Sequence, residues 1–285
     1  MAILTFTSDF GHRDYYVAAV KGAILSQLSD VTIVDISHEV KAFNISEAAY
    51  LLRNAYRYFP KGTVHLIGVK SEASPEAPHR LVMYEGHCFV AADTGIFRLM
   101  FKKEPDAVYD LHLASSSDVL TFPVLHVLVN AVCHLLRGGT PEVIGKKGSS
   151  IREAHQGKVY KDQDTIKGHV IHVDRYDNLI TDIPQRIFNE VGLGRKFKVL
   201  LRTHKYKVKK IATQYSDGNS GDVVALFNTE GFLEIAIRDG APDAGGGAAQ
   251  LLGLTSSDLI VVVFESDEPS VDSGFERANP EALSQ

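Results

Sequence analysis

The stretch that decides the fold of the N-terminal half is Ile3–Gly22, ILTFTSDFGHRDYYVAAVKG. Its first residues form a short apolar run typical of a buried strand, and a polar turn containing Asp9 and Gly11 follows. Apolar residues at helical spacing then predict an amphipathic helix. An acidic residue in the loop between a strand and a helix is a common ligand position in open α/β sheets. Asp9 is therefore either a ligand residue, able to accept two hydrogen bonds from a ribose diol, or a cap or turn residue.

Two further strands and a helix follow the first helix. Val31–Ser37 is rich in β-branched residues, Ile45–Phe59 has apolar residues at spacings of three and four, and Thr63–Val69 is again strand-like. Asn44, with Glu47 three residues later, marks the start of the second helix as a capping box. The order strand–helix–strand–helix–strand predicts a mostly parallel sheet with helices on its faces.

In such a sheet the loops that follow the parallel strands meet at one edge. Those loops carry Asp9, His38 and Lys70, so we expect a candidate site there. Further on, the sequence predicts a hairpin around Glu85-Gly86 and a helix over Pro123–Arg137 that ends at two glycines.

The pattern changes in the C-terminal half to short strands with turns between them, which predicts a small β-barrel or sandwich. The expected strands are Gly168–Val173, Leu179–Ile183, Phe197–Leu201, Tyr206–Ile211, Val223–Phe227, Phe232–Ile237 and Leu259–Phe264. The fold class is thus an α/β N-terminal domain with a mostly parallel sheet, followed by a smaller all-β, barrel-like domain. We place the domains at 1–150 and 165–265, with a linker within 140–165 and a disordered tail over 266–285.

Composition narrows the class of protein. The chain of 285 residues is 45% hydrophobic and 23% charged, as is usual for a globular protein. Its net charge of −5 gives no reason to expect a nucleic acid or an anionic membrane as partner. No apolar run approaches the roughly 20 residues of a membrane span, and we expect no export signal. Cys88 and Cys133 lack metal-ligand spacing, so we expect a cytoplasmic protein without a metal site.

Several segments together resemble one family. They are TSDFGHRDYYVAAVKG, IVDISHEVKAFNISEAAYLL, YFPKGTVHLIGV, VIHVDRYDNLITDIP, ALFNTEGFLEIAI and AAQLLGL, in that order along the chain. The set resembles the S-adenosylmethionine hydroxide adenosyltransferases, which are related to fluorinating and chlorinating enzymes. Single motifs such as SDFG are weakly specific, whereas the ordered set covers nearly the whole chain.

The resemblance implies a substrate, an assembly and a set of binding residues. S-adenosylmethionine would be the substrate, with no further cofactor, and would lie between the N-terminal domain of one subunit and the C-terminal domain of the next in a homotrimer. Asp9 would hold the ribose hydroxyls, Asp174 and Thr229 the methionine end, and Asn178 the adenine edge. Phe232 would lie near the purine. The alternative for the Asp174–Asn178 segment is an ordinary β-turn.

The chain departs from the family at the groups that act on water. The family uses an Asp, a nearby Arg and a His; the resemblance places Lys70 at the Asp position and Pro123 at the His position. Arg80 is the candidate for the family's Arg, and Glu72 is a nearby group that could replace the lost base. Lys70 is either a solvated loop residue, a group that orients an anion, or a base whose pKa is lowered by burial.

Three hypotheses follow. The leading one is an enzyme that hydrolyses S-adenosylmethionine to adenosine and methionine with Lys70, Glu72 and Arg80 as its altered catalytic set. The second is a binding protein of the same fold that has lost turnover, which the changes at Lys70 and Pro123 favour. The third, halide in place of hydroxide, is suggested only by the cation at position 70.

Overall fold

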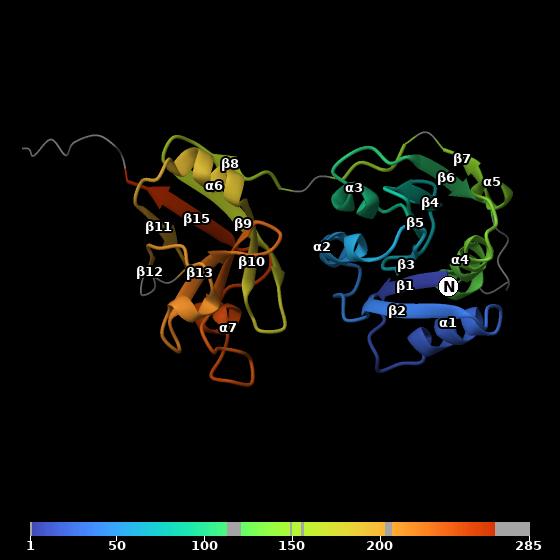
Figure 1. The fold of residues 1–285 in the computed structure, drawn as a ribbon, viewed down its shortest axis with the longest axis horizontal. Coiled ribbons are helices and arrows are strands. Elements are labelled where there is room, and N and C mark those ends of the chain that lie inside the picture. The colour runs from blue at the N-terminus through green and yellow to red at the C-terminus, as the bar shows by residue number, and fades with distance from the viewer. Residues whose placement is uncertain (1, 113–120, 149, 155–156, 203–206, 266–285) are drawn as a thin grey trace, which may run out of the picture. The chain divides into compact units, whose positions relative to one another are not determined.

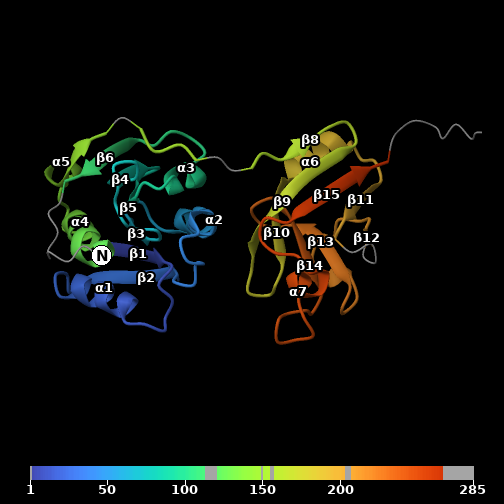
Figure 2. The ribbon, with the colours of Figure 1, turned by 180° about the vertical axis from the view of Figure 1, so that it is seen from behind.

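The computed structural model describes residues 2–112, 121–148, 150–154, 157–202 and 207–265. The chain forms two compact units, Met1–Lys158 and Val159–Gln285, which are described separately below (Figures 1 and 2). The tail that we expected over 266–285 lies outside the described residues. No helix within the described ranges is both long enough and apolar enough to cross a membrane.

The first unit is built on a seven-stranded mixed sheet with the strand order β2-β1-β3-β5-β4-β6-β7. Its strands are β1 (Ala2–Ser8), β2 (Val31–Ser37), β3 (Val64–Gly68), β4 (His79–Tyr84), β5 (His87–Ala92), β6 (Ala107–Leu111) and β7 (Gly145–Lys147). The pairs β1–β2, β1–β3 and β3–β5 are parallel, and the remaining pairs are antiparallel. The predicted parallel core and the predicted hairpin between β4 and β5 are therefore confirmed.

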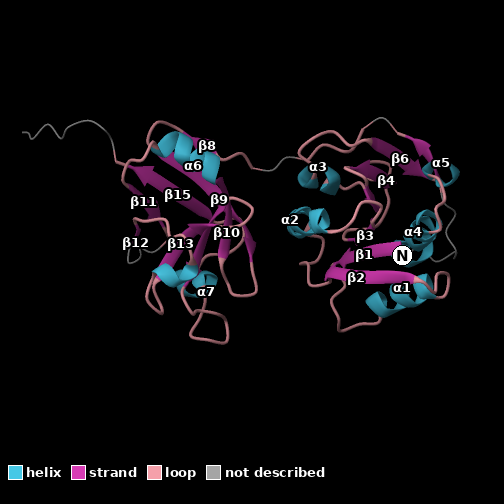
Figure 3. Ribbon diagram, viewed as in Figure 1, coloured by secondary structure: helices cyan, strands magenta, loops and turns pink. Residues whose placement is uncertain are grey.

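Helices cover both faces of this sheet (Figure 3). They are α1 (Tyr16–Leu25), α2 (Ile45–Ala55), the 3-10 turn η1 (Tyr56–Tyr58), α3 (Ile96–Met100), the π-helical turn η2 (Val124–Leu128), α4 (Val129–Leu136) and α5 (Pro141–Ile144). Apolar residues of α2 and α3 fill one core cluster, and those of α1 and α4 fill a second cluster. The two helix layers pack against opposite faces of the central strands, because successive side chains of a strand point to opposite faces of the sheet.

The start of α2 confirms the predicted N-cap residue Asn44, but the reciprocal half of the predicted capping box differs. The side chain of Asn44 accepts a hydrogen bond of 3.1 Å from the backbone N–H of Glu47. The Glu47 carboxylate accepts a hydrogen bond of 3.0 Å from the backbone N–H of Lys41 rather than from that of Asn44. Asn44 thus fixes where the helix begins, and Glu47 extends the cap to the preceding turn.

The expected linker over 140–165 is too long at its N-terminal end. Residues 141–147 form α5 and β7, and β7 pairs with β6 in the first sheet. These elements are short and polar, so they leave no periodic signal in the sequence. Backbone hydrogen bonds to β6 hold β7 at the edge of the sheet, and the two lysines of β7 are exposed to solvent.

The second unit is an antiparallel, half-barrel sheet with the order β12-β11-β15-β9-β10-β14-β13, and β8 pairs with β9. Its strands are β8 (Tyr160–Lys161), β9 (Thr165–Val173), β10 (Leu179–Pro184), β11 (Phe197–Leu200), β12 (Lys207–Val208), β13 (Val223–Phe227), β14 (Phe232–Ile237) and β15 (Leu259–Phe264). The expected series of short strands is confirmed, with β12 shorter than expected among the described residues.

Three short helical elements of this unit were not expected: α6 (Gln185–Gly192), the 3-10 turn η3 (Tyr215–Asp217) and α7 (Ala248–Leu252). Helix α6 places Phe188 and Val191 in the core of the half-barrel, and α7 adds Ala248 and Leu252. Helices α6 and α7 have 8 and 5 residues, which is too short for an apolar pattern in the sequence to be assigned to a helix rather than to a strand or loop.

Candidate functional site

A cavity of about 580 Å³ opens at the carboxyl edge of the parallel strands in the first unit. It is lined by residues of the loops after β1, β2 and β3, of the start of α1 and of the segment before η2: Asp9, Phe10, Tyr16, Ala42, Phe43, Lys70, Ser71, Glu72, Thr121, Phe122 and Pro123. The sequence-based candidates Asp9, Lys70 and Glu72 therefore meet in one cavity, as parallel strand ends predict.

Asp9 links two loops of this cavity. Its Oδ2 accepts a hydrogen bond of 2.7 Å from the backbone N–H of Phe43, in the loop after β2. Helix α1 begins at Tyr16, and its N-cap residue Tyr15 makes no side-chain cap hydrogen bond. Asp9 is thus not the cap of α1; it joins two loops at the rim of the cavity, and it is only half-buried there.

Aromatic rings form one wall of the cavity. The ring centroids of Phe10, Tyr16 and Phe122 lie 5.2–5.7 Å apart in edge or tilted contacts. Phe43, at φ +63°, leaves 70% of its surface exposed, so its ring is available to a ligand. Such a wall suits a planar base, and its ring faces attract a cation.

The loop after β3 supplies the charged groups of the cavity. Lys70 has φ +48°, a left-handed conformation that is uncommon outside glycine and asparagine. Its ammonium forms no hydrogen bond or ion pair with any residue that the structure describes. The next residue, Ser71, is fixed to β4, because its carbonyl oxygen lies 2.8 Å from Nε2 of His79. Burial lowers the pKa of His79, so this ring is neutral near pH 7.

Arg80 occupies a different environment from the other catalytic candidates. Its Nη1 lies 2.6 Å from Asp93 and its Nε lies 2.7 Å from Asp110. The guanidinium thus joins β4 to β6 and to the end of β5, and two carboxylates balance its charge. Among the described residues, those that line the cavity do not include Arg80.

His38 is also close to the cavity without lining it. The side chain is 1% exposed, and its Nδ1 lies 2.7 Å from Oγ of Ser8. Sequence reasoning did not single out Ser8, because a serine at the end of a strand has no distinctive signal.

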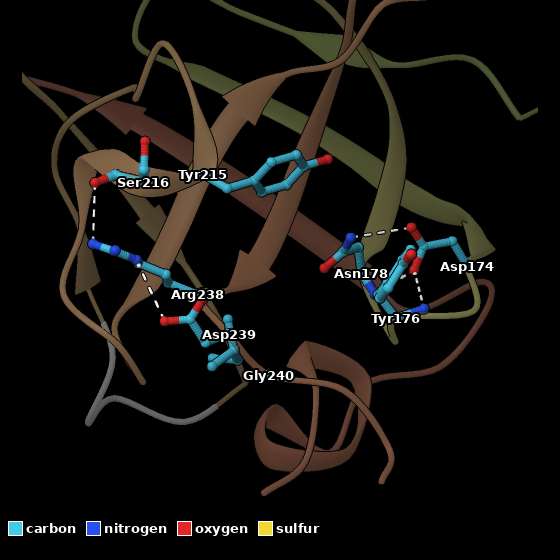
Figure 4. A pocket seen from close by; sticks show the side chains of 9 residues that line it. Asp174, Tyr176, Asn178, Tyr215, Ser216, Arg238, Asp239 and Gly240 are labelled. Atoms are coloured by element: carbon cyan, nitrogen blue, oxygen red, sulfur yellow. Dashed lines mark hydrogen bonds and ion pairs between the residues drawn. The ribbon is translucent and has the colours of Figure 1, made fainter. Parts of the chain in front are cut away.

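A second cavity, of about 420 Å³, lies in the second unit. Its lining residues are Asp174, Tyr176, Asn178, Tyr215, Ser216, Ile237, Arg238, Asp239 and Gly240. Figure 4 shows Asp174, Tyr176 and Asn178 grouped on one side and Ser216, Arg238 and Asp239 on the other. Two of the sequence-based candidates, Asp174 and Asn178, therefore share this cavity.

Asp174 organises the turn that carries Asn178. Its Oδ1 accepts hydrogen bonds from the backbone N–H groups of Tyr176, at 2.9 Å, and Asn178, at 2.8 Å. Its Oδ2 accepts a third, of 3.0 Å, from Nδ2 of Asn178. The Asp174–Asn178 segment thus forms a turn, as the alternative predicts, and the same turn lines the cavity.

The glycine run at 245–247 packs against this turn. A Cβ on Gly247 would lie 2.4 Å from the carbonyl oxygen of Tyr176 and 2.3 Å from Cβ of Asp177. The backbone N–H of Ala249 donates a hydrogen bond of 2.9 Å to the carbonyl oxygen of Asp177. Gly247 therefore allows a close backbone approach that any side chain would block.

Thr229 lies in the turn between β13 and β14, and Phe232 is the first residue of β14. There Oδ1 of Asn228 accepts hydrogen bonds of 3.1 Å from the backbone N–H groups of Glu230 and Phe232. Among the described residues, neither Thr229 nor Phe232 is part of the lining of the second cavity.

Tyr215 is a lining residue that the sequence reasoning missed. Its hydroxyl donates a hydrogen bond of 2.6 Å to Glu234, which is 4% exposed. Burial raises the pKa of Glu234, against hydrogen bonds from Tyr215 and Asn228 that lower it. The sequence gives no sign of this pair, since the two residues lie on separate elements.

The described residues contain no group of three or more His, Cys, Asp or Glu side chains that could hold a metal ion. Both cavities present aromatic rings and carboxylates, and the second adds the amide of Asn178; these are groups that bind organic molecules.

Comparison with known proteins decides the family. The N-terminal domain of the SAM hydroxide adenosyltransferases matches residues 4–145, and the C-terminal domain matches residues 168–261. The chain belongs to the SAM hydroxide adenosyltransferase family. The two matches fall in the two compact units, and the family acts on S-adenosylmethionine as a small-molecule substrate.

Relatives of this SAM hydroxide adenosyltransferase family member include two kinds of enzyme. The (R)-S-adenosyl-L-methionine hydrolase of Methanocaldococcus jannaschii is 31% identical over 255 residues, which cover 82% of this chain and 88% of the relative. A fluorinase of Actinopolyspora mzabensis is 24% identical over 270 residues, covering 82% of this chain and 90% of that enzyme. A crystal structure of a conserved protein from Thermotoga maritima has a TM-score of 0.81 at 24% identity and covers 91% of this chain and 99% of that one. This last likeness concerns the fold alone.

Proposed function

We propose that this protein hydrolyses S-adenosyl-L-methionine to adenosine and L-methionine. The observation that carries the proposal is the cavity at the carboxyl edge of the first sheet, where Asp9 lies beside an aromatic wall. A carboxylate suits a ribose diol, and the ring faces of Phe10, Tyr16 and Phe122 suit a sulfonium cation. Family membership and the 31% identity to an (R)-S-adenosyl-L-methionine hydrolase support the same substrate.

The reaction needs little chemical assistance from the protein. A water oxygen forms a bond to C5′ while the C5′–S bond breaks, and sulfur keeps the electron pair as the neutral thioether of methionine. The water loses one proton, which a base or the solvent accepts. Because the sulfonium is already a good leaving group, the protein must mainly align the oxygen with the C5′–S bond and help it to lose that proton.

In this proposal Lys70 and Glu72 assist the water. Both line the cavity, and the Glu72 carboxylate is the candidate base. The Lys70 ammonium opposes the sulfonium; because Lys70 is exposed, two like charges about 4 Å apart repel by about 1 kcal/mol, the value in water. In this proposal Glu72 offsets that repulsion and Lys70 orients the attacking oxygen. Arg80, held by Asp93 and Asp110, would act only through the strands that it joins.

The second unit supplies the other part of the proposed site. Asn178 would contact the adenine edge, and the Asp174 turn and Thr229 the methionine end. We infer a homotrimer in which these groups face the first unit of a neighbouring subunit. A molar mass about three times the 31.2 kDa of one chain, measured by light scattering, is the expected result. A monomer in solution would contradict the shared site.

The alternative function is S-adenosylmethionine or adenosine binding without turnover. Two residues of the cavity lining favour it, because Lys70 and Pro123 cannot replace the carboxylate and the imidazole that the family resemblance implies at these positions. Incubation of the protein with S-adenosylmethionine, followed by chromatography, distinguishes the two functions. Adenosine and methionine formed in equal amounts support the enzyme, whereas calorimetric binding without adenosine after several hours supports the alternative.

A further inference from the structure

A chain of polar contacts starts at the buried Ser8 and His38, next to Asp9, and ends at the exposed Asp35 and the partly exposed Lys21. Oγ of Ser8 lies 2.7 Å from Nδ1 of His38, and Nε2 of His38 lies 3.1 Å from Oδ1 of Asp35 in a bent approach. The other oxygen of Asp35 lies 2.5 Å from Nζ of Lys21 at the surface. Ser8 is the last residue of β1, and Asp9 follows it directly.

The order serine–histidine–aspartate resembles a nucleophilic triad, but its geometry excludes that role. Ser8 has no exposed surface, and His38 is 1% exposed, so no substrate atom can reach Oγ. A serine nucleophile must be accessible at the site that it attacks. The three groups must therefore act on the structure around them.

Two further contacts tie the same segments together. The backbone N–H of Gly11 donates a hydrogen bond of 2.7 Å to the carbonyl oxygen of His38, and Asp9 accepts its hydrogen bond from the N–H of Phe43. The His38 ring also packs edge-on against Phe6, with centroids 4.6 Å apart. Ser8, Asp9 and Gly11 thus all contact the segment that follows β2.

The charges around His38 determine which ring nitrogen carries hydrogen. Burial lowers its pKa most strongly; Asp35 raises the pKa, and His12 and Lys21 lower it further. The His12 ring lies 5.1 Å from the His38 ring. A neutral ring with a carboxylate at Nε2 has its hydrogen on that nitrogen, so Nδ1 accepts the hydrogen bond from the Ser8 hydroxyl.

We propose that Ser8 and His38 are positioning residues that hold the Asp9 carboxylate in the orientation required to bind a ribose diol. This inference rests on the proposed function, because it assumes that Asp9 contacts the ribose. Loss of the Ser8–His38 hydrogen bond frees the residue adjacent to Asp9, and small misplacements of a binding group weaken a directional contact. The contact of His38 with Asp35 is bent, so it contributes less to this positioning than the hydrogen bond between His38 and Ser8.

The first sheet contains a matched control. Oγ1 of Thr5, also on β1, lies 2.7 Å from Nδ1 of the buried His65. This pair has the same chemistry and the same distance as Ser8–His38. Thr5, however, lies three residues before Ser8 and four before Asp9, away from the carboxyl end of the strand. Thr5→Val therefore removes an equivalent buried hydrogen bond without touching the Asp9 loop.

The test compares the affinities for adenosine and 2′-deoxyadenosine, measured by calorimetry on the full chain. The deoxy compound lacks one of the hydroxyls that Asp9 would hold. We expect Ser8→Ala to reduce the preference for adenosine by about three- to tenfold, the effect of one lost or misplaced hydrogen bond. Thr5→Val should lower thermal stability to a similar extent and leave the preference unchanged. An equal change of preference in both variants would show a merely structural role and overturn the proposal.

Two variants of His38 distinguish the contact at its Nδ1 from the contact at its Nε2. His38→Asn keeps a polar group near the Nδ1 position and should retain most of the preference, whereas His38→Gln places it near Nε2 and should lose it. Nitrogen NMR of the wild type should show hydrogen on Nε2 of His38 at pH 7. Loss of the preference in His38→Asn as complete as in His38→Gln would overturn the role of the Ser8–His38 contact.

The controls also separate failure of this inference from failure of the proposed function. If the wild type does not prefer adenosine to 2′-deoxyadenosine, Asp9 does not hold the diol and the proposed ribose contact is wrong. If the wild type shows the preference and Ser8→Ala keeps it, the proposed function stands and the positioning role is wrong.

Discussion

The carboxylate of Asp9 and the backbone N–H of Phe43 are joined by a hydrogen bond of 2.7 Å between the loops after β1 and β2. One oxygen of Asp9 is thereby used within the protein, and the residue that it holds, Phe43, has an exposed ring that lines the same cavity. This contact makes an acidic ligand group and an aromatic ring one unit at the rim of the cavity.

Asp9→Ala should weaken adenosine binding by about 1–3 kcal/mol, the range for a charged hydrogen bond. Asp9→Asn should lose less, since an amide oxygen can still accept the hydrogen bond from Phe43. Calorimetry at constant salt measures both variants. Unchanged affinity in Asp9→Ala would make Asp9 a loop-joining residue only.

Lys70→Asn should tighten S-adenosylmethionine binding, because it removes a cation facing the sulfonium. Asparagine tolerates the left-handed backbone at φ +48°, so the change adds little strain. Lys70 is exposed, so we expect a gain of about 1 kcal/mol, the value for two charges about 4 Å apart in water. Neutral adenosine is the control ligand, and its affinity should not change. Weaker binding of S-adenosylmethionine in the variant would contradict the repulsion.

Glu72→Gln should slow adenosine formation and leave adenosine affinity unchanged, because it removes the candidate base without changing the size of the side chain. A general base typically contributes about 10²–10⁴-fold to a rate. Single-turnover kinetics with S-adenosylmethionine measure the effect. A rate equal to that of the wild type would assign the proton to the solvent or to another group.

The first unit should lose stability as the pH falls below about 6.5. His65 is fully buried next to His87, and burial lowers its pKa to about 3. Between pH 6.5 and 3 the unfolded chain binds a proton that the folded chain does not, so the unfolding free energy falls with decreasing pH. For His65 alone the loss is about 2 kcal/mol at pH 5. Urea unfolding at pH 7 and pH 5 measures it; His65→Asn should have a shallower pH dependence, and an unchanged slope would exclude His65 as the source.

Asp174→Ala should destabilise the second unit by about 1–2 kcal/mol, since two backbone N–H groups and the Asn178 amide lose their acceptor. Asp174→Asn keeps one acceptor oxygen and should cost less. Thermal unfolding compares the two variants. Equal stability of Asp174→Ala and the wild type would show that water replaces the carboxylate in this turn.

The sequence by itself determined the parallel core and the series of short strands. Ile3–Phe6, Val31–Ser37 and Thr63–Val69 are apolar or β-branched runs separated by helix-length segments, and that local pattern leaves few topologies. It also determined that Asp9 and Lys70 share one sheet edge, because the loops after parallel strands must meet there. The elements α5, β7 and α6 could not be predicted from the sequence, because each is too short for its apolar pattern to be assigned to a helix or a strand.

Only the tertiary structure decided what the polar side chains do. Asp9 is paired with Phe43, Arg80 with Asp93 and Asp110, and Ser8 with His38. These partners are separated by 13 to 34 residues along the chain. A hydrogen bond depends on distances of a fraction of an ångström, whereas sequence patterns report only which face of an element is apolar. The fold could therefore be predicted from the spacing of apolar residues, and the partners of its charged and buried polar groups could not.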